Sequence, residues 1–265
     1  RLLPVEQPTL SKDLIDQVTL SRADGETAVL LSNDGDGHYT GLLVEPYQYP
    51  VDPEQAEALL TALEASGVSI PLWDGILIEE TVRIAPGATI LPGCVLRGNT
   101  TIAAGSVIGP GSVLTDAVIG KNCTVKNTYI TESTLEENVS IGPFSQVRPG
   151  CHIAAGCKIG DFVEVKNSHI GQKTAIAHLT YVGDTDCGSG VNFGCGVAIA
   201  NFNGKEKFRT TIGDNAFLGC NTNLVAPVTI GAGAYTAAGS TITNEVAADS
   251  LAIARSVQVV KKQWA

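Results

Sequence analysis

Between residues 148 and 207 the chain carries polar residues that can do acid–base and anion-binding chemistry: Arg148, Glu164, Lys166, His178, Tyr181, Asn192, Asn201 and Lys207. An imidazole has an unperturbed pKa of about 6.5, which suits it to take a proton from an attacking amine at neutral pH. We therefore predict that His178 is a general base. A carboxylate such as Glu164, fourteen residues earlier, would orient the imidazole ring and stabilise its protonated form.

The cations of this group point to an anionic substrate. Arg148 and Lys166 are 18 residues apart, which is one turn of the repeat described below, so they can stack on one edge of the fold. Two like charges on adjacent rungs repel each other. An anion bound between them would offset this repulsion, which would explain why the two cations are placed together. The alternative is a pair of solvated surface cations.

These polar residues are embedded in a six-residue repeat. From Ile84 the chain divides into IAPGAT, ILPGCV, LRGNTT, IAAGSV and IGPGSV, and the pattern returns from Ile141 and from Ile212. Each unit begins with an aliphatic residue and has a small or β-branched residue four places later. A period of six fits a short strand followed by a turn, in which the aliphatic side chain points inward and Gly or Asn permits the turn. Stacked units would bury one continuous aliphatic core.

This hexapeptide pattern resembles the left-handed parallel β-helix family, in which three hexads form one triangular coil. The resemblance implies an all-β solenoid in which residues 78–245 form about nine coils. It also implies a homotrimer with active sites between adjacent prisms. The fold hosts acyltransferases, carbonic anhydrases and regulatory subunits, so it does not decide the function.

The repeat is interrupted once at length, between Ile199 and Ile212. The excess residues 203–209 (NGKEKFR) must leave the prism as a loop, and they include two Lys and one Arg. Loops held by a rigid scaffold often carry function, although a solvated excursion is the simpler alternative.

Composition excludes some classes of function. The 265-residue chain has a net charge of −10, all of it within the first 75 residues, which hold 3 basic and 13 acidic residues. Without a basic stripe, nucleic acid is not expected as a partner. No apolar run approaches the roughly 20 residues that span a bilayer, and no signal peptide is recognisable, so we expect a cytoplasmic protein without membrane contact. The chain has no Met, even at its first position, which suggests that it begins inside a longer gene product.

The chain has seven Cys, in neither zinc-site nor redox-motif spacing. Four of them, Cys94, Cys123, Cys151 and Cys157, fall at one repeat position where a small apolar side chain fits. We therefore predict buried structural thiols in a reducing compartment.

Several ordered segments are specific enough to name a family. They are RPG (148–150), FVEVKN (162–167), AHLTYVGD (177–184), VNFGCG (191–196), NGKEKFRT (203–210), LVAPVTIGAGA (224–234) and LAIAR (251–255). Together they resemble the C-terminal acetyltransferase domain of the bacterial bifunctional N-acetylglucosamine-1-phosphate uridyltransferase / glucosamine-1-phosphate N-acetyltransferase. The resemblance covers about residues 60 to 265.

The resemblance implies acetyl transfer from acetyl-CoA to the 2-amino group of glucosamine 1-phosphate, in the biosynthesis of UDP-N-acetylglucosamine for the cell wall. By motif position it makes His178 the general base, supported by Glu164. It assigns sugar-phosphate and sugar binding to Arg148, Lys166, Lys207, Tyr181 and Asn192. It assigns acetyl-CoA binding to Asn201, Cys195, Phe202, Cys220, Ala238, Arg255 and Lys261, with a backbone N–H near Cys220 for the thioester oxyanion.

The chain departs from the family pattern at three cofactor positions. Cys195, Phe202 and Cys220 stand where relatives commonly have Ala, Tyr and Ser. Each change keeps the approximate size of the side chain but alters its polarity, so we expect activity to persist with an altered affinity for acetyl-CoA.

The segment before the repeats does not follow the six-residue pattern and predicts helical and α/β structure instead. Residues 53–66 (PEQAEALLTALEAS) have an early Pro, acidic residues in the first turn and helical apolar spacing, so we predict a linker helix within residues 51–75, before a β-helix domain over residues 76–265. Residues 1–50 weakly resemble an internal α/β piece of the uridyltransferase, without its metal-binding Asp or its Gly-rich nucleotide loop. We therefore expect a nucleotidyltransferase remnant, no uridyltransferase activity, and a solvated turn at residues 34–38.

Other functions stay open on the sequence alone. The acceptor could be another amino sugar or a sugar nucleotide, and the chain could be a non-catalytic regulatory or binding subunit. A zinc carbonic anhydrase is disfavoured, because the four histidines His38, His152, His169 and His178 lack the close pair that such a site uses. We predict no metal for the acetyl-transfer step.

Overall fold

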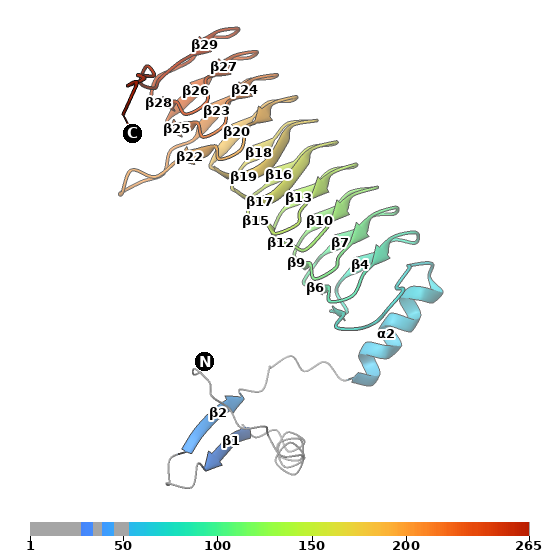
Figure 1. Cartoon of the computed structure of the whole chain (residues 1–265). Helices are drawn as coiled ribbons and strands as arrows, with labels where there is room; N and C mark the ends of the chain where they lie inside the picture. Colours follow the sequence, from blue (N-terminus) through green and yellow to red (C-terminus); the bar gives the residue numbers. More distant parts are fainter. Residues whose placement is uncertain (1–27, 34–38, 45–52, 265) are drawn as a thin grey trace. The chain divides into compact units, whose positions relative to one another are not determined.

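The computed structural model describes residues 28–33, 39–44 and 53–264. The chain divides into two compact units, Arg1–Asp52 and Pro53–Ala265. In the first unit, β1 (Ala28–Asn33) and β2 (Tyr39–Val44) form an antiparallel pair (Figure 1). The expected turn at residues 34–38 lies outside the described residues, and the assignment of residues 1–50 to a nucleotidyltransferase remnant stays a prediction.

The second unit opens with the helix α2 (Pro53–Ala65), where the sequence predicts one. Pro53 occupies its first position, where a missing N–H costs nothing, and Glu54 lies in the first turn. The helix ends before Gly67, whose φ of 96° is a left-handed conformation that glycine adopts without a Cβ clash. Its residue Leu60 is buried against the core.

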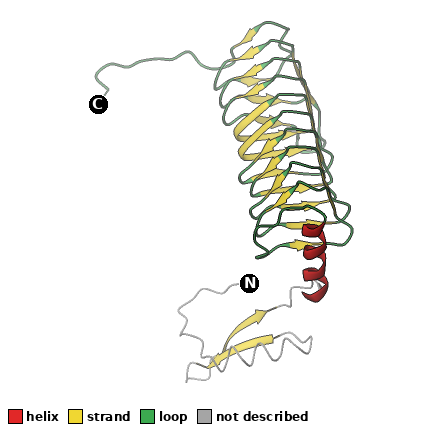
Figure 2. Ribbon diagram, turned by 90° about the vertical axis from the view of Figure 1, so that its right-hand side faces the viewer, coloured by secondary structure: helices red, strands yellow, loops and turns green. Residues whose placement is uncertain are grey.

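After α2 the chain winds into stacked coils with three faces, each a column of parallel strands (Figures 1 and 2). Face 1 contains β5 (Thr89–Ile90), β8 (Val107–Ile108), β11 (Thr124–Val125), β14 (Ser140–Ile141), the first parts of β17 (Lys158–Lys166) and β19 (Ala175–Gly183), β21 (Asn192–Phe193), β24 (Phe217–Leu218), β27 (Tyr235–Thr236) and β29 (Leu251–Ala252).

Face 2 contains β3 (Leu77–Ile78), β6 (Val95–Arg97), β9 (Val113–Thr115), β12 (Thr128–Thr131), β15 (Ser145–Val147), the second parts of β17 and β19, β22 (Ala198–Ala200), β25 (Asn223–Val225) and β28 (Thr241–Ile242). Face 3 contains β4 (Arg83–Ile84), β7 (Thr101–Ile102), β10 (Val118–Ile119), β13 (Thr134–Leu135), β16 (His152–Ile153), β18 (His169–Ile170), β20 (Thr185–Cys187), β23 (Thr210–Ile212) and β26 (Val228–Ile230).

The core is a stack of aliphatic side chains inside the coils. On face 3, Ile119, Leu135, Ile153 and Ile170 pair in register from strand to strand and are each at most 1% exposed. Their neighbours on the same strands point outward, as the alternation of a β-strand requires. The predicted left-handed parallel β-helix is confirmed. Face 3 has nine strands and faces 1 and 2 have ten each, close to the expected nine coils.

Two elements differ from the short strands around them. β17 and β19 each run for nine residues without a break, from face 1 around the corner into face 2. They pair in parallel at seven positions, which makes this the most continuous strand pairing in the described solenoid. The predicted site residues Glu164, Lys166, His178 and Tyr181 lie on these two strands.

The buried thiols predicted at Cys94, Cys123, Cys151 and Cys157 are confirmed, and Cys187 is buried as well. Five cysteines are buried, and burial raises the pKa of the Cys94 thiol to about 11 and that of Cys187 to about 12. Cys195 and Cys220 are exposed, because they occupy a corner of the prism where the side chain points outward. In the described part of the chain, none of the helices is long and apolar enough to cross a membrane.

The alternation on β10 provides a test of the core. Ile119 is 1% exposed and Val118 is 45% exposed on the same two-residue strand. We expect Ile119→Ala to lower the free energy of unfolding by about 3 kcal/mol, because it leaves a cavity in the aliphatic stack, and Val118→Ala to lower it by less than about 1 kcal/mol. Urea denaturation followed by circular dichroism measures both, and equal losses would contradict the assigned inward and outward faces.

Candidate active site

The corner between faces 1 and 2 carries a vertical column of side chains, which we call the corner column. On face 1, Ile159, Ile176, Phe193, Leu218 and Thr236 pair in register. Two residues beyond each of them the chain turns the corner, so the corner column consists, in order, of Asp161, His178, Cys195, Cys220 and Ala238. The predicted base and three predicted cofactor residues therefore share one edge of the prism.

His178 is held by a carboxylate in this column. Asp161 lies directly opposite His178 in the β17–β19 register, and its Oδ1 is 3.1 Å from Nδ1 of the imidazole. The pKa of Asp161 is below its ordinary value because its own backbone N–H and the hydrogen bond from His178 stabilise the carboxylate. The side chains of His178 and Asp161 are 61% and 43% exposed in the single chain.

The structure does not place Glu164 beside His178 as the sequence analysis expects. Glu164 lies opposite Tyr181, three residues beyond the rung of His178, and its Oε1 accepts a hydrogen bond from Arg148 at 2.8 Å. This ion pair raises the pKa of Arg148. The carboxylate that contacts His178 is Asp161, which lies just before the FVEVKN motif and is not among the predicted site residues.

The predicted cations gather where face 2 meets face 3. Val147 pairs with Val165, so Arg148 and Lys166 stand on adjacent rungs, as their spacing predicts. Lys207 approaches Lys166 from the loop between β22 and β23, and this neighbour, together with burial, lowers the pKa of Lys166. Two ammonium groups held this close favour an anion between them.

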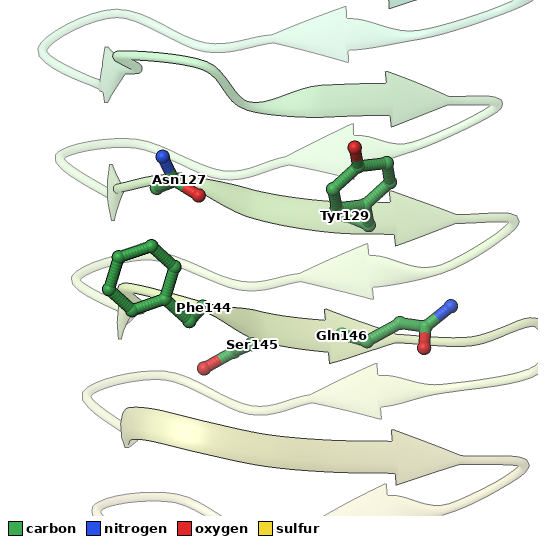
Figure 3. A pocket seen from close by; sticks show the side chains of 5 residues that line it. All are labelled: Asn127, Tyr129, Phe144, Ser145 and Gln146. Atoms are coloured by element: carbon green, nitrogen blue, oxygen red, sulfur yellow. The ribbon is translucent and has the colours of Figure 1, made fainter. Parts of the chain in front are cut away.

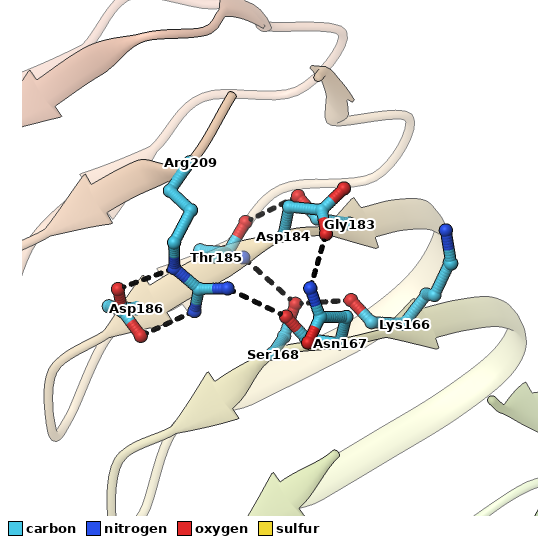
Figure 4. A network of polar contacts seen from close by, with 8 residues as sticks. All are labelled: Lys166, Asn167, Ser168, Gly183, Asp184, Thr185, Asp186 and Arg209. Carbon is cyan, nitrogen blue, oxygen red and sulfur yellow. Dashed lines mark hydrogen bonds and ion pairs between the residues drawn. The ribbon is translucent and has the colours of Figure 1, made fainter. Parts of the chain in front are cut away.

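The loop that carries Lys207 leaves the coils after β22, as predicted (Figure 1). It is a structured turn: Oδ1 of Asn203 accepts hydrogen bonds from the backbone N–H groups of Lys205 and Glu206, at 2.8 and 2.9 Å. Arg209 ties the end of the loop to face 3 through a two-pronged ion pair with Asp186 and a 3.2 Å hydrogen bond to the carbonyl of Asn167 (Figure 4). The position of Lys207 is therefore fixed from both sides.

Asp184 lies beneath the two lysines and is only 5% exposed. The side-chain amides of Asn167 and Asn201 both donate hydrogen bonds to its carboxylate (Figure 4 shows the contact with Asn167). Burial alone would raise the pKa of Asp184, but these two amides and the charges of Lys166 and Lys207 outweigh it, so the pKa lies below the ordinary value. No motif in the sequence singles out Asp184, because its burial depends on Asn167 and Asn201 from neighbouring coils.

Further polar contacts connect this cluster to the sugar-binding candidates. The amide of Asn201 is 3.4 Å from the hydroxyl of Tyr181, so it joins Tyr181 to Asp184. Arg148, Glu164, Lys166, Tyr181, Asn201 and Lys207 thus lie in one region on the face 2 side of the corner column. The arrangement brings a carboxylate-bound imidazole, two neighbouring ammonium groups and amide donors to one surface.

Other predicted residues lie elsewhere in the single chain. Asn192 is on face 1, on the opposite side of the corner column from Tyr181. Phe202 is 56% exposed in the loop. Arg255 is exposed near the end of the corner column, because its Cδ would lie 3.9 Å from a Cβ on Gly239, the residue after Ala238. Lys261 is exposed in the segment after β29, where its Nζ lies 5.2 Å from the ring centre of Trp264.

A shallow hollow on face 2 lies on coils that precede the cation cluster. It is lined by Asn127, Tyr129, Phe144, Ser145 and Gln146 (Figure 3). These lining residues include no charged side chain, so the hollow itself is not suited to hold a phosphate. The ring of Phe144 stacks on that of Phe162 from the next coil at 5.6 Å.

The expectation that the histidines lack a close pair is wrong on face 3. His152 and His169 pair on adjacent rungs, and their rings stack at 5.0 Å, so this chain does contain a close histidine pair. Nε2 of His152 hydrogen-bonds Glu136 at 2.8 Å, which lowers the pKa of that carboxyl group. Among the described residues, no three His, Cys, Asp or Glu side chains form a group that could hold a metal ion.

Comparisons with known proteins decide the family. Residues 81–116, 132–167 and 209–244 match the family described as bacterial transferase hexapeptide (six repeats). The chain carries a bacterial transferase hexapeptide domain. It is 51% identical over 191 residues to the bifunctional protein GlmU of Clostridium acetobutylicum, which covers 72% of this chain and 42% of that protein. It is 50% identical over 199 residues to the GlmU of Acetivibrio thermocellus, which covers 75% and 43%.

The resemblance predicted from the motifs is thereby confirmed, and the chain spans less than half the length of these relatives. Among solved structures, the UDP-N-acetylglucosamine acyltransferase of Francisella novicida matches 68% of this hexapeptide-repeat chain and 65% of its own chain, at 19% identity and a TM-score of 0.42.

The two aspartates on either side of Thr185 test the role of the buried carboxylate. We expect Asp184→Ala to lower the free energy of unfolding by about 2 to 4 kcal/mol, because it leaves the amides of Asn167 and Asn201 without their acceptor. Asp186→Ala removes an exposed ion pair and should cost less than about 1 kcal/mol. Thermal and urea unfolding measure both; similar values for the two variants would contradict the buried role of Asp184.

The lowered pKa of Asp184 also predicts a pH dependence. A carboxyl group with a lower pKa in the folded state stabilises the fold fully above its unfolded pKa of about 4, and this contribution is lost as the pH falls through the folded value. The stability difference between the wild type and Asp184→Asn should therefore shrink below pH 4. A difference that grows on acidification would have the wrong sign.

Proposed function

We propose that this domain transfers the acetyl group of acetyl-CoA to the 2-amino group of glucosamine 1-phosphate, giving N-acetylglucosamine 1-phosphate for UDP-N-acetylglucosamine synthesis. The observation that carries the proposal is the meeting of two features at one place. A carboxylate-bound histidine stands in the corner column, and a cluster of cations lies on the adjoining face. The GlmU relatives support the same reaction, since about three quarters of the chain aligns with them at about half identity.

In the proposed reaction, the amine nitrogen attacks the thioester carbonyl while Nε2 of His178 takes a proton from the amine. The carbon–sulfur bond then breaks, and the CoA thiolate leaves and gains a proton. Lys166, Lys207 and Arg148 hold the phosphate, because they supply the positive charge of this region. Tyr181, Asn192 and Asn201 bind the sugar and the reacting acetyl group through hydrogen bonds.

The rungs beyond His178 suit an extended thioester. Cys195, Cys220 and Ala238 follow His178 in the corner column, and all three are small and exposed. The backbone N–H of Cys220 donates no hydrogen bond to another backbone group within the described part of the chain, so it is available to the thioester oxygen. For Phe202 we propose a contact with acetyl-CoA from the loop, while Arg255 and Lys261 would supply positive charge for the CoA phosphates near the end of the solenoid.

The proposed assembly is a homotrimer, and the apolar corner supports it. Phe144, Phe162 and Leu179 are 58 to 60% exposed and adopt positive φ angles, a backbone conformation that is costly for bulky residues. They lie one residue beyond Pro143, Asp161 and His178, and thus beside the base. A second copy covering this corner would bury them, and its face 1 would bring Asn192 to the cations of face 2.

A coupled assay tests the reaction. With acetyl-CoA and glucosamine 1-phosphate, the wild type should release free thiol, and His178→Ala should lower kcat by at least about a hundredfold because the base is lost. Substantial turnover by His178→Ala would remove His178 from this role. His152→Ala, on face 3, is the matched control and should keep wild-type turnover.

The phosphate site is tested by comparing acceptors. Lys166→Ala and Lys207→Ala should raise KM for glucosamine 1-phosphate about tenfold or more, with a small effect on glucosamine. Preference for an acceptor without the anomeric phosphate, or for a sugar nucleotide, would instead favour another amino-sugar acetyltransferase. Failure to bind acetyl-CoA in calorimetry would favour a regulatory subunit.

The assembly is tested by molar mass in solution. Light scattering should give a trimer for the wild type and smaller species for Phe162→Glu, which places a charge in the proposed contact. Val118→Glu, at an exposed position of face 3, should leave the trimer intact. A monomeric wild type with full activity would contradict the proposed assembly.

A further inference from the structure

The contact between Asp161 and His178 follows from the longest strand pairing of the solenoid. β17 and β19 stay paired around the corner, whereas most coils have a break between their face 1 and face 2 strands. The pairing places Asp161 directly opposite His178, with 3.1 Å between Oδ1 and Nδ1. The corner geometry, rather than a flexible side chain, therefore brings the two groups together.

We propose that Asp161 is the positioning residue of the general base: its carboxylate fixes the tautomer of His178 and stabilises the imidazolium that forms during acetyl transfer. The inference rests on the proposed function only in that His178 acts as the base. It assigns to Asp161 the part that the family resemblance gives to Glu164.

The hydrogen bond determines which imidazole nitrogen reacts. An ionised carboxylate can only accept a hydrogen bond. Nδ1 of His178 therefore carries the ring proton, and its N–H donates a hydrogen bond to Oδ1 of Asp161. The lone pair of Nε2 is then free to accept a proton from the substrate amine. When Nε2 takes that proton, the ring becomes a cation next to the carboxylate, and the new charge is compensated where it forms.

The carboxylate of Glu164 is engaged in a different interaction. It holds Arg148 at 2.8 Å and faces Tyr181, so its charge orients a substrate cation rather than the base. The strands around His178 carry few other titratable groups. On β17 they are Lys158, Asp161, Glu164 and Lys166; on β19 there is Tyr181; and Cys195 follows in the corner column.

Asp161 is therefore the anionic group in hydrogen-bond contact with the imidazole among the described residues. Removing the charge of Asp161 makes the protonated imidazole of His178 less stable, which weakens the base at neutral pH. The same loss moves the protonation of the ring to lower pH, so the enzyme stays active further into the acidic range while its maximal rate falls.

The pH profile of kcat/KM for glucosamine 1-phosphate tests this assignment. For Asp161→Asn we expect kcat to fall about tenfold, KM for both substrates to stay within about twofold, and the acidic limb to move to lower pH. Asp161→Glu should recover part of the rate, because it restores a carboxylate near Nδ1. A merely structural role would lower the rate without moving the acidic limb.

Two further variants serve as controls for this experiment. Asp116→Asn changes a carboxylate at another corner, where Oδ1 of Asp116 accepts a 2.8 Å hydrogen bond from the N–H of Asn99, and it should leave kcat, KM and the pH profile unchanged. Glu164→Gln should raise KM for the sugar phosphate through Arg148 and leave the acidic limb in place. A shift of the limb in Glu164→Gln but not in Asp161→Asn would overturn the inference.

A second readout does not depend on turnover. In protein labelled with ¹⁵N-histidine, the neutral ring of His178, identified by its loss in His178→Gln, should show the Nδ1–H tautomer in the wild type and a shift toward Nε2–H in Asp161→Ala. An unchanged tautomer in Asp161→Ala would overturn the inference even if the enzyme is active. Absence of acetyl transfer by the wild type would reject the proposed function, while the tautomer measurement would still decide the role of Asp161.

Discussion

The rest of the structure depends on the register between successive coils. Parallel strands on neighbouring rungs are about 4.8 Å apart, and each rung buries an aliphatic residue such as Ile153 or Ile170 at the same place. A slip of one residue would turn these side chains outward, so the register is strongly fixed. Every position therefore stands above its equivalent, and both the core and the surface chemistry are organised as columns.

Stacking in columns brings like groups together, and the molecule compensates the resulting cost locally. The ammonium groups of Lys166 and Lys207 are balanced from below by Asp184, which is buried and held by two amides. Arg148 is balanced by Glu164 from the next rung. Each of these cations thus has a carboxylate close by, and the loop anchored by Arg209 adds the charge of Lys207 to a surface that the coils already form.

The fold was predictable because its signal is periodic: the hexads beginning at Ile84 repeat the same inward residue many times. The site was predictable only where the spacing stays regular. Arg148 and Lys166 follow an 18-residue coil, but Asp161 and His178 are 17 residues apart, because a five-residue unit shortens that coil. Without coordinates, this one-residue change hides which carboxylate faces the imidazole. The burial of Asp184 depends on Asn167 and Asn201 from neighbouring coils, which no local pattern encodes.

The corner column also has a fixed spacing, because each coil contributes one side chain to it. Three steps separate His178 from Ala238, which corresponds to about 14 Å at the spacing of parallel strands. The stretch is lined by small side chains on the side toward β29, whereas Phe162 and Phe144 stand beside the column on the side toward α2. If the proposed thioester lies along this column, its direction is set by the side with small residues and its length by the number of rungs. Adding or deleting a coil between His178 and β29 would then change the chain length that fits rather than the chemistry at its end.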